Sequence, residues 1–97
     1  MDNNKIYIND IGTIIKLNAG SDISTATVLK IKVTKPDKTT DIWDAELDEE
    51  NNYLANYTTI DDDLDQKGEY KIQLYVEMPE WKGHGETNTF RVYELFT

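Results

Sequence analysis

The sequence predicts an all-β fold in a single domain spanning residues 1–97. Apolar and polar residues alternate with a period of two along most of the chain, and short polar turns separate the alternating runs. No segment carries the apolar stripe of an amphipathic helix. The length of 97 residues suits one domain and leaves no room for a second.

The first three candidate strands lie before residue 35. Residues 5–8 and 13–17 are short alternating runs. Residues 28–34 form a longer run in which every second residue is apolar, so we expect one buried and one solvated face. The buried face consists of Leu29, Ile31 and Val33.

A hairpin is expected next. Lys35–Lys38 forms its turn, because Pro36 fixes φ at the first central position and Asp37 is suited to the second. The following strand, Thr39–Leu47, has Trp43, Ala45 and Leu47 on one face. We expect the indole of Trp43 to lie at the centre of the core.

The clearest strand of the chain follows Gly68. Its apolar residues are Tyr70, Ile72, Leu74, Val76 and Met78, and Pro79 ends it. An earlier strand, residues 53–58, also alternates, but either of its faces could be the buried one.

The last strand is expected to form a hairpin with the strand that ends at Pro79. Residues 80–85 include two glycines and predict a loop. The strand then runs from Glu86 or Thr87 to about Leu95, with Phe90 and Val92 facing inward.

Strands of this number and length are typical of an immunoglobulin-like β-sandwich of about seven antiparallel strands. Such domains carry a tyrosine corner near the start of the sixth strand, and Tyr70 occupies that place. Ile72 then stands where antibody domains have their second cysteine, and Trp43 takes the role of the core tryptophan. Residues 64–67 could form one helical turn before this strand.

The composition excludes several classes of function. The chain has no cysteine, so it forms neither disulfides nor zinc–thiolate sites. A net charge of −9 and scattered basic residues predict no binding to nucleic acid or to an anionic membrane surface. The polar N-terminus predicts no secretory signal, and no segment is apolar enough to span a membrane.

The sequence predicts neither an enzyme nor a cofactor. The single histidine, His84, lies between glycines, and no motif positions Ser21 or Ser24 as a nucleophile. Three carboxylates, Asp61, Asp63 and Asp65, form a weak candidate for a calcium site, because calcium prefers oxygen ligands. Their spacing does not match an EF-hand, and an acidic turn that caps a short helix is the alternative.

Exposed aromatic residues are the candidates for a protein interface. Trp81 lies in the expected flexible loop with Lys82 and His84, where the indole could anchor a partner or fold back as a plug at one end of the sandwich. Tyr75 and Tyr93 face outward on neighbouring strands, where they could bind a partner or form a cross-strand pair.

Several motifs are similar to those of a family of short proteins from tailed bacteriophages and prophages. They are Asp10–Thr13, Asp22–Ser24, Ala26–Thr27, Lys35–Asp37, Asp63–Gln66 and Tyr75–Gly83. The resemblance extends from about Ile8 to Tyr93, and its most specific parts are Asp63–Gln66 and Trp81–Thr87. Lys38 departs from it, because the family usually has glycine there. If this position is left-handed, the lysine costs about 1 kcal/mol or more.

The resemblance implies a structural protein of the virion, made in the host cytoplasm and present in several symmetric copies. Its partners are other virion proteins, and its place is head decoration, the head–tail connector, or the tail or baseplate. The alternative function is a carbohydrate or host-surface binding module. That module would use Trp81, Tyr75 and Tyr93 as stacking platforms, with calcium at Asp61–Asp65.

Overall fold

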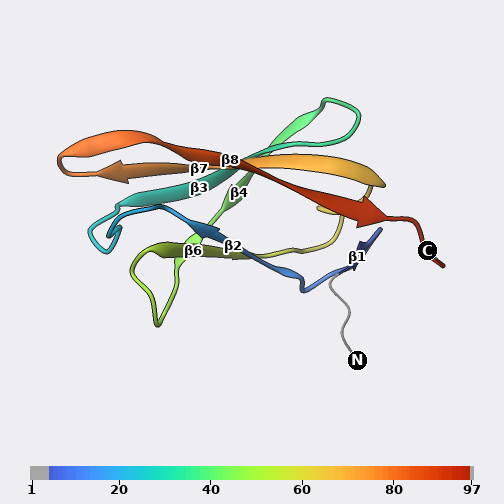
Figure 1. Ribbon diagram of the computed structural model, residues 1–97, viewed down its shortest axis with the longest axis horizontal. Helices are drawn as coiled ribbons and strands as arrows, with labels where there is room; N and C mark the ends of the chain where they lie inside the picture. Colours follow the sequence, from blue (N-terminus) through green and yellow to red (C-terminus); the bar gives the residue numbers. More distant parts are fainter. Residues whose placement is uncertain (1–4, 97) are drawn as a thin grey trace.

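The computed structural model describes residues 5–96 and shows two β-sheets that pack face to face (Figure 1). The strands are β1 (Ile6–Tyr7), β2 (Ile14–Asn18), β3 (Val28–Thr34), β4 (Thr40–Asp44), β5 (Glu46–Leu47), β6 (Leu54–Thr58), β7 (Gly68–Met78) and β8 (Trp81–Tyr93). The five-stranded sheet has the order β1-β8-β7-β3-β4, and the three-stranded sheet has the order β2-β6-β5. The predicted all-β class is confirmed.

The prediction of about seven antiparallel strands is wrong in two details. The described residues contain eight strands, and β1 pairs with the end of β8 in parallel. The extra strand arises because the predicted run Thr39–Leu47 is divided between the sheets. Ala45 still donates its N–H to the carbonyl of Leu29 (3.0 Å), and Glu46 then pairs with Asn56 of the other sheet. The alternation continues through this change of sheet, so the sequence pattern does not reveal it.

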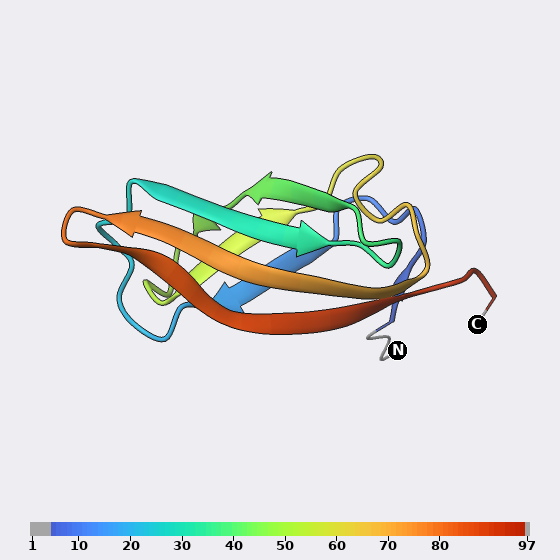
Figure 2. The ribbon, with the colours of Figure 1, turned by 90° about the horizontal axis from the view of Figure 1, so that it is seen from above.

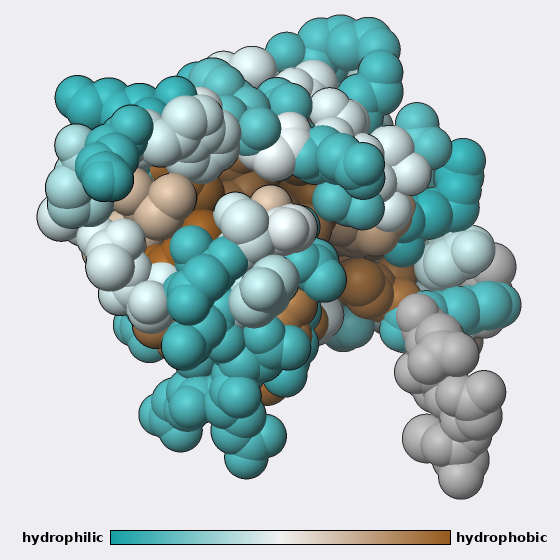
Figure 3. All heavy atoms as spheres, turned by 60° about the vertical axis from the view of Figure 1, so that its left-hand side comes forward, coloured by the Kyte–Doolittle hydropathy of each residue, from teal (hydrophilic) through white to brown (hydrophobic). Residues whose placement is uncertain are grey.

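The core lies between the sheets and contains the predicted faces of β3 and β7. Figure 2 looks onto the five-stranded sheet and shows β2 and β6 beneath it, and Figure 3 shows hydrophobic atoms between two hydrophilic layers. The buried hydrophobic residues are Ile15, Leu17, Ile23, Ile31, Val33, Trp43, Ala55, Leu64, Tyr70, Ile72, Leu74, Val76 and Val92. Leu29, Met78 and Phe90 pack against them and are partly buried.

Trp43 lies in this core, as predicted, with 2% of its surface exposed. Its ring stacks on that of Tyr57 in β6, with 4.7 Å between the ring centroids. The buried face of residues 53–58 is therefore the one that contains Ala55 and Tyr57.

The expected loop at residues 80–85 is wrong, because β8 already begins at Trp81. Only Pro79 and Glu80 connect the strands of this long hairpin, which forms one end of the molecule in Figures 1 and 2. The glycines that suggest a loop are strand residues. Gly83 pairs with Val76, and a Cβ on Gly85 would lie 3.8 Å from Leu74, so both glycines face inward.

The expected helical turn at residues 64–67 is absent, and residues 60–63 form a non-helical turn instead. The N–H of Asp63 donates to the carbonyl of Ile60 (3.2 Å). Asp62 has a φ of 71°, outside the right-handed helical region, so the turn cannot continue as a helix. Leu64 follows with 1% exposure and anchors the segment in the core.

The Tyr70 hydroxyl makes the expected hydrogen bond, accepting the N–H of Gln66 at 3.2 Å. Its ring is fully buried and stacks on Phe90, with 5.1 Å between the ring centroids.

We therefore expect Tyr70→Phe to lower the free energy of unfolding by about 1 kcal/mol, because the Gln66 N–H loses its acceptor. Urea denaturation measures this loss. Tyr53→Phe is the control, since Tyr53 is exposed, and an equal effect of both variants would contradict the prediction.

Candidate functional site

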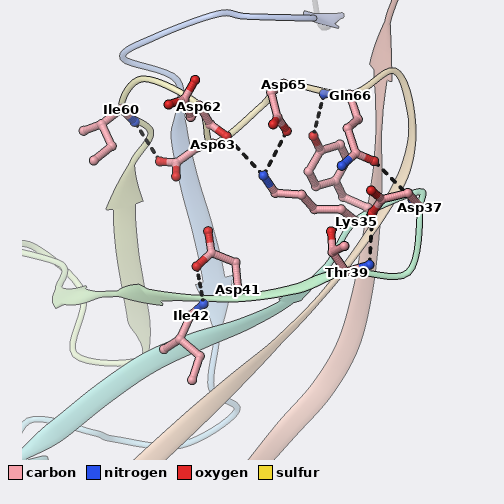
Figure 4. Close-up of polar contacts among 11 residues, drawn as sticks. Lys35, Asp37, Thr39, Asp41, Ile42, Ile60, Asp62, Asp63, Asp65 and Gln66 are labelled. Carbon is pink, nitrogen blue, oxygen red and sulfur yellow. Dashed lines mark hydrogen bonds and ion pairs between the residues drawn. The ribbon is translucent and has the colours of Figure 1, made fainter.

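The two turns that contain Lys35 and Asp65 lie against each other and are joined by side chains (Figure 4). Lys35 Nζ donates to Asp65 Oδ1 at 2.9 Å and to the carbonyl oxygen of Asp62 at 3.1 Å. Burial lowers the pKa of Lys35, but the hydrogen bond and the negative charge of Asp65 raise it by more, so the pKa is raised overall. The side chain of Gln66 accepts the N–H of Asp37 at 3.1 Å.

A glycine allows the turns to approach this closely. Gly68 has a φ of 125°, and a Cβ at this position would lie 3.0 Å from side-chain atoms of Pro36. Any other residue would therefore meet backbone strain and a contact with Pro36 tight enough to require a small shift. The segments Lys35–Asp37 and Asp63–Gln66 are thus two halves of one structural contact.

The turn predicted at Lys35–Lys38 is confirmed, with the Lys38 N–H donating to the Lys35 carbonyl at 2.8 Å. Asp37 accepts the hydroxyl and N–H of Thr39, and these hydrogen bonds lower its pKa. Lys38 has a φ of 76°. Lys38 is therefore left-handed, a conformation that costs a lysine about 1 kcal/mol or more and that glycine adopts without a steric penalty.

Asp63 is a buried structural carboxylate with 6% exposure. Its Oδ2 accepts the N–H of Ile60 at 2.8 Å and the hydroxyl of Tyr57 at 2.5 Å. Burial, and then the hydrogen bond and charge of Asp63, raise the pKa of Tyr57. Asp63 therefore joins its own turn to the ring that stacks on Trp43.

The three calcium candidates do not act together. Asp63 accepts the hydrogen bonds described above, Asp65 forms an ion pair with Lys35, and Asp61 is exposed. Across residues 5–96, no group of three or more histidine, cysteine or carboxylate side chains is arranged to hold a metal ion.

Three of the interface candidates gather on the outer face of the five-stranded sheet, near the tip of the β7–β8 hairpin. The rings of Tyr75 and His84 lie opposite each other, with 5.0 Å between their centroids. The Tyr75 hydroxyl donates to Glu77 (2.8 Å), which lies 3.8 Å from Lys82 Nζ, and the bond to Glu77 raises the pKa of Tyr75.

Lys32 of β3 completes this cluster, although no pattern in the sequence points to it. Its ammonium group lies 2.9 Å from His84 Nε2 and 5.0 Å from the centroid of the Tyr75 ring. Lys32 and His84 are 52 residues apart in the chain, so only the pairing of β3, β7 and β8 brings them together.

Trp81 belongs to the opposite side of the hairpin. It pairs with Met78 of the inner face, and its indole lies over Gly83, where a Cβ would be 2.4 Å from Trp81 Cζ2. The ring nevertheless remains 46% exposed. The Trp-x-Gly spacing therefore places a partly exposed indole against its own strand.

Tyr93 lies at the far end of β8, so the expected pair of Tyr75 and Tyr93 is wrong. In the register of the hairpin, Tyr75 is opposite His84, and Tyr93 pairs with Tyr7 of β1. The Tyr7 and Tyr93 ring centroids are 6.5 Å apart, and Lys5 Nζ lies 5.0 Å from the Tyr93 centroid. The register of the hairpin separates the two candidate tyrosines, because Tyr75 lies near the tip and Tyr93 follows Val92, the partner of Gly68 at the other end.

Two hollows of opposite charge lie on the outer faces of the two sheets. The basic hollow, about 440 Å³ on the five-stranded sheet, is lined by residues including Lys32, Lys71, Asp41, Ile42, Gln73 and Thr87. The acidic hollow, about 470 Å³ beside the three-stranded sheet, is lined by residues including Lys16, Asp44, Glu46, Asp48, Glu49 and Glu50.

No protein-family model matches this sequence, and a search of curated proteins finds no significant match. Among residues 5–96, no helix has the length and apolar character needed to cross a membrane.

Proposed function

We propose that the chain is an immunoglobulin-like structural module of a tailed-phage particle, which acts without catalysis through contacts with other virion proteins and with its own copies. The sheet orders support the fold part of this proposal. Strands β8-β7-β3-β4 correspond to the G-F-C-C′ order of variable-type domains, and β2-β6-β5 corresponds to B-E-D. The Tyr70 hydrogen bond fits the tyrosine corner. Trp43 departs from the pattern, because it lies on β4 rather than on β3.

The observation that carries the functional part is the exposed indole of Trp81. A tryptophan at a loop tip would lose conformational entropy when it docks, which weakens binding. Trp81 is instead held on a paired strand over Gly83 while 46% of its surface remains exposed. A large, pre-ordered aromatic surface is typical of an interface anchor.

The acidic character of the chain bears on its place in the particle. A net charge of −9 disfavours a position beside packaged DNA and favours an outer surface of the head, connector, tail or baseplate. The carbohydrate-binding alternative requires a shared platform of Trp81, Tyr75 and Tyr93. Trp81 lies on the inner face of the hairpin tip, Tyr75 on its outer face and Tyr93 at the far end of β8. The three side chains therefore do not form one platform.

The proposal is tested directly by mass spectrometry of purified particles from the phage that encodes the chain. We expect the protein in a fixed ratio to a known virion protein, after washing in high salt. Its presence in the infected cell together with its absence from purified particles would overturn the proposal.

Trp81→Ala tests the proposed contact. We expect the variant to melt within a few degrees of the parent, because the indole is half exposed, but to enter particles at least tenfold less well. A tenfold loss requires only about 1.4 kcal/mol of contact energy. Complementation of a deletion phage followed by quantitative mass spectrometry measures incorporation. If Trp81→Ala instead unfolds the isolated protein, the indole is part of the structure and not an anchor.

A further inference from the structure

The two hollows present opposite charges on different faces of the molecule, and β4 contributes to both, with Ile42 in the basic hollow and Asp44 in the acidic one. The basic hollow lies on the five-stranded sheet, which is uppermost in Figure 1, and has two lysines and one aspartate in its lining. The acidic hollow, beside the lower sheet, has five carboxylates and one lysine in its lining. Within a chain of net charge −9, this is a marked separation of charge.

One lysine that lines the basic hollow, Lys32, forms no ion pair with a carboxylate among residues 5–96. On the same sheet, Lys30 lies 2.5 Å from Asp44 and Lys82 lies 3.8 Å from Glu77. The Lys32 ammonium instead contacts His84 and the Tyr75 ring, and neither of these residues lines the hollow. Lys71 adds a second positive charge to the lining. A carboxylate that approaches the rim of the hollow would therefore meet an ammonium group that is not paired with another carboxylate.

The acidic hollow offers such carboxylates on an exposed surface. Asp48 forms its own ion pair with Lys16 at 3.5 Å, and its pKa is lowered first by the side chain of Asn56 and then by the N–H of Glu50. Glu46, Glu49 and Glu50 are exposed, and no ion pair joins them to other residues of the described chain. These three are available to a partner.

We propose that the basic hollow of one copy receives the carboxylates of the acidic hollow of a second copy. The contact is head-to-tail, since it joins different surfaces of the two copies, and it generates a ring or a filament depending on the rotation between them. It deepens the proposed function and rests on it, because it names one partner of the virion module. Repulsion between the net charges is screened beyond about 10 Å at 0.1 M salt, so the local charges decide the contact.

Charge reversal on each face tests this pairing by sedimentation equilibrium at 0.1 M salt. We expect the parent to self-associate with a dissociation constant on the order of 10⁻⁴ M. The variant Lys32→Glu/Lys71→Glu should associate at least tenfold more weakly. The variant Glu46→Lys/Glu49→Lys should also associate at least tenfold more weakly, although it has a smaller net charge and less overall repulsion. Mixed in equal amounts, the two variants should associate within threefold of the parent, since each supplies the face that the other has lost.

Controls separate specific pairing from net charge and from misfolding. Lys67→Glu changes the net charge as Lys71→Glu does, but it lies in the loop before β7, so its association should stay within twofold of the parent. Circular dichroism and melting temperature check the fold of each variant. A parent that is monomeric at 1 mM in this assay, or variants that do not rescue each other, would overturn the inference. If the protein is nonetheless found in purified particles, the proposed function stands without this contact.

Discussion

Replacing Trp43 with alanine is expected to lower the free energy of unfolding by about 3–5 kcal/mol. The indole is 2% exposed and stacks on Tyr57, so the variant loses buried apolar area, a ring contact and the atoms that fill the core at this point. Urea denaturation followed by far-ultraviolet circular dichroism measures the loss without depending on tryptophan fluorescence.

Two further variants show what causes the loss of stability in Trp43→Ala. Trp43→Phe should recover part of the loss, because the Trp43 Nε1 group is buried without a hydrogen-bond partner among residues 5–96, so its removal leaves no acceptor unsatisfied. The Trp43→Phe variant can also be measured if Trp43→Ala is already unfolded in water. Trp81→Ala is the exposed control and should cost less than about 1 kcal/mol. A similarly small cost for Trp43→Ala would mean that β4 is out of register by one residue.

The long strands of the fold could be predicted because burial on one side leaves a period of two in the sequence. Val28–Thr34 and Tyr70–Met78 show that period clearly, and their predicted inner faces are buried or partly buried in the structure. The burial of Trp43 could be predicted for the same reason, whereas the Tyr70 hydrogen bond could be predicted only from the tyrosine corner of immunoglobulin-like domains.

The start of β8 could not be predicted, because its glycines are normally signals of a loop. Gly83 serves a different purpose here, since it leaves space for the Trp81 ring. The change of sheet at Ala45 could not be predicted either. Trp43 on one sheet and Leu47 on the other both face the core, so the alternation of the sequence continues across the change.

The candidate site was predicted only in part. Tyr75, Lys82 and His84 do lie together, but Lys32 reaches them from a distant strand, and Trp81 lies on the other side of the hairpin. Both hollows also combine residues from several strands, and such combinations depend on sheet order. A single sequence carries little information on that order, since any two alternating strands could be neighbours.

Replacing Asp63 with alanine is expected to lower the free energy of unfolding by about 2–4 kcal/mol. The Asp63 carboxylate is 6% exposed and accepts hydrogen bonds from the Ile60 N–H and the Tyr57 hydroxyl. Its removal leaves both donors without their acceptor beneath the turn, and it frees the ring that covers Trp43. Urea denaturation measures the effect, and Asp63→Asn, which keeps an acceptor oxygen without the charge, should have an intermediate cost.

Asp61→Ala is the matched control, because Asp61 belongs to the same acidic turn but is exposed. Its cost should stay below about 0.5 kcal/mol. Repeating the measurements with calcium at about 5 mM separates the structural role of Asp63 from metal binding, because this concentration exceeds the dissociation constants of weak extracellular calcium sites, about 10⁻⁴–10⁻³ M. If Asp63 acts through Ile60 and Tyr57, calcium leaves the parent and both variants unchanged. A parent stabilised by calcium, with the gain lost in Asp61→Ala as well as in Asp63→Ala, would instead show that the turn rearranges to bind the ion.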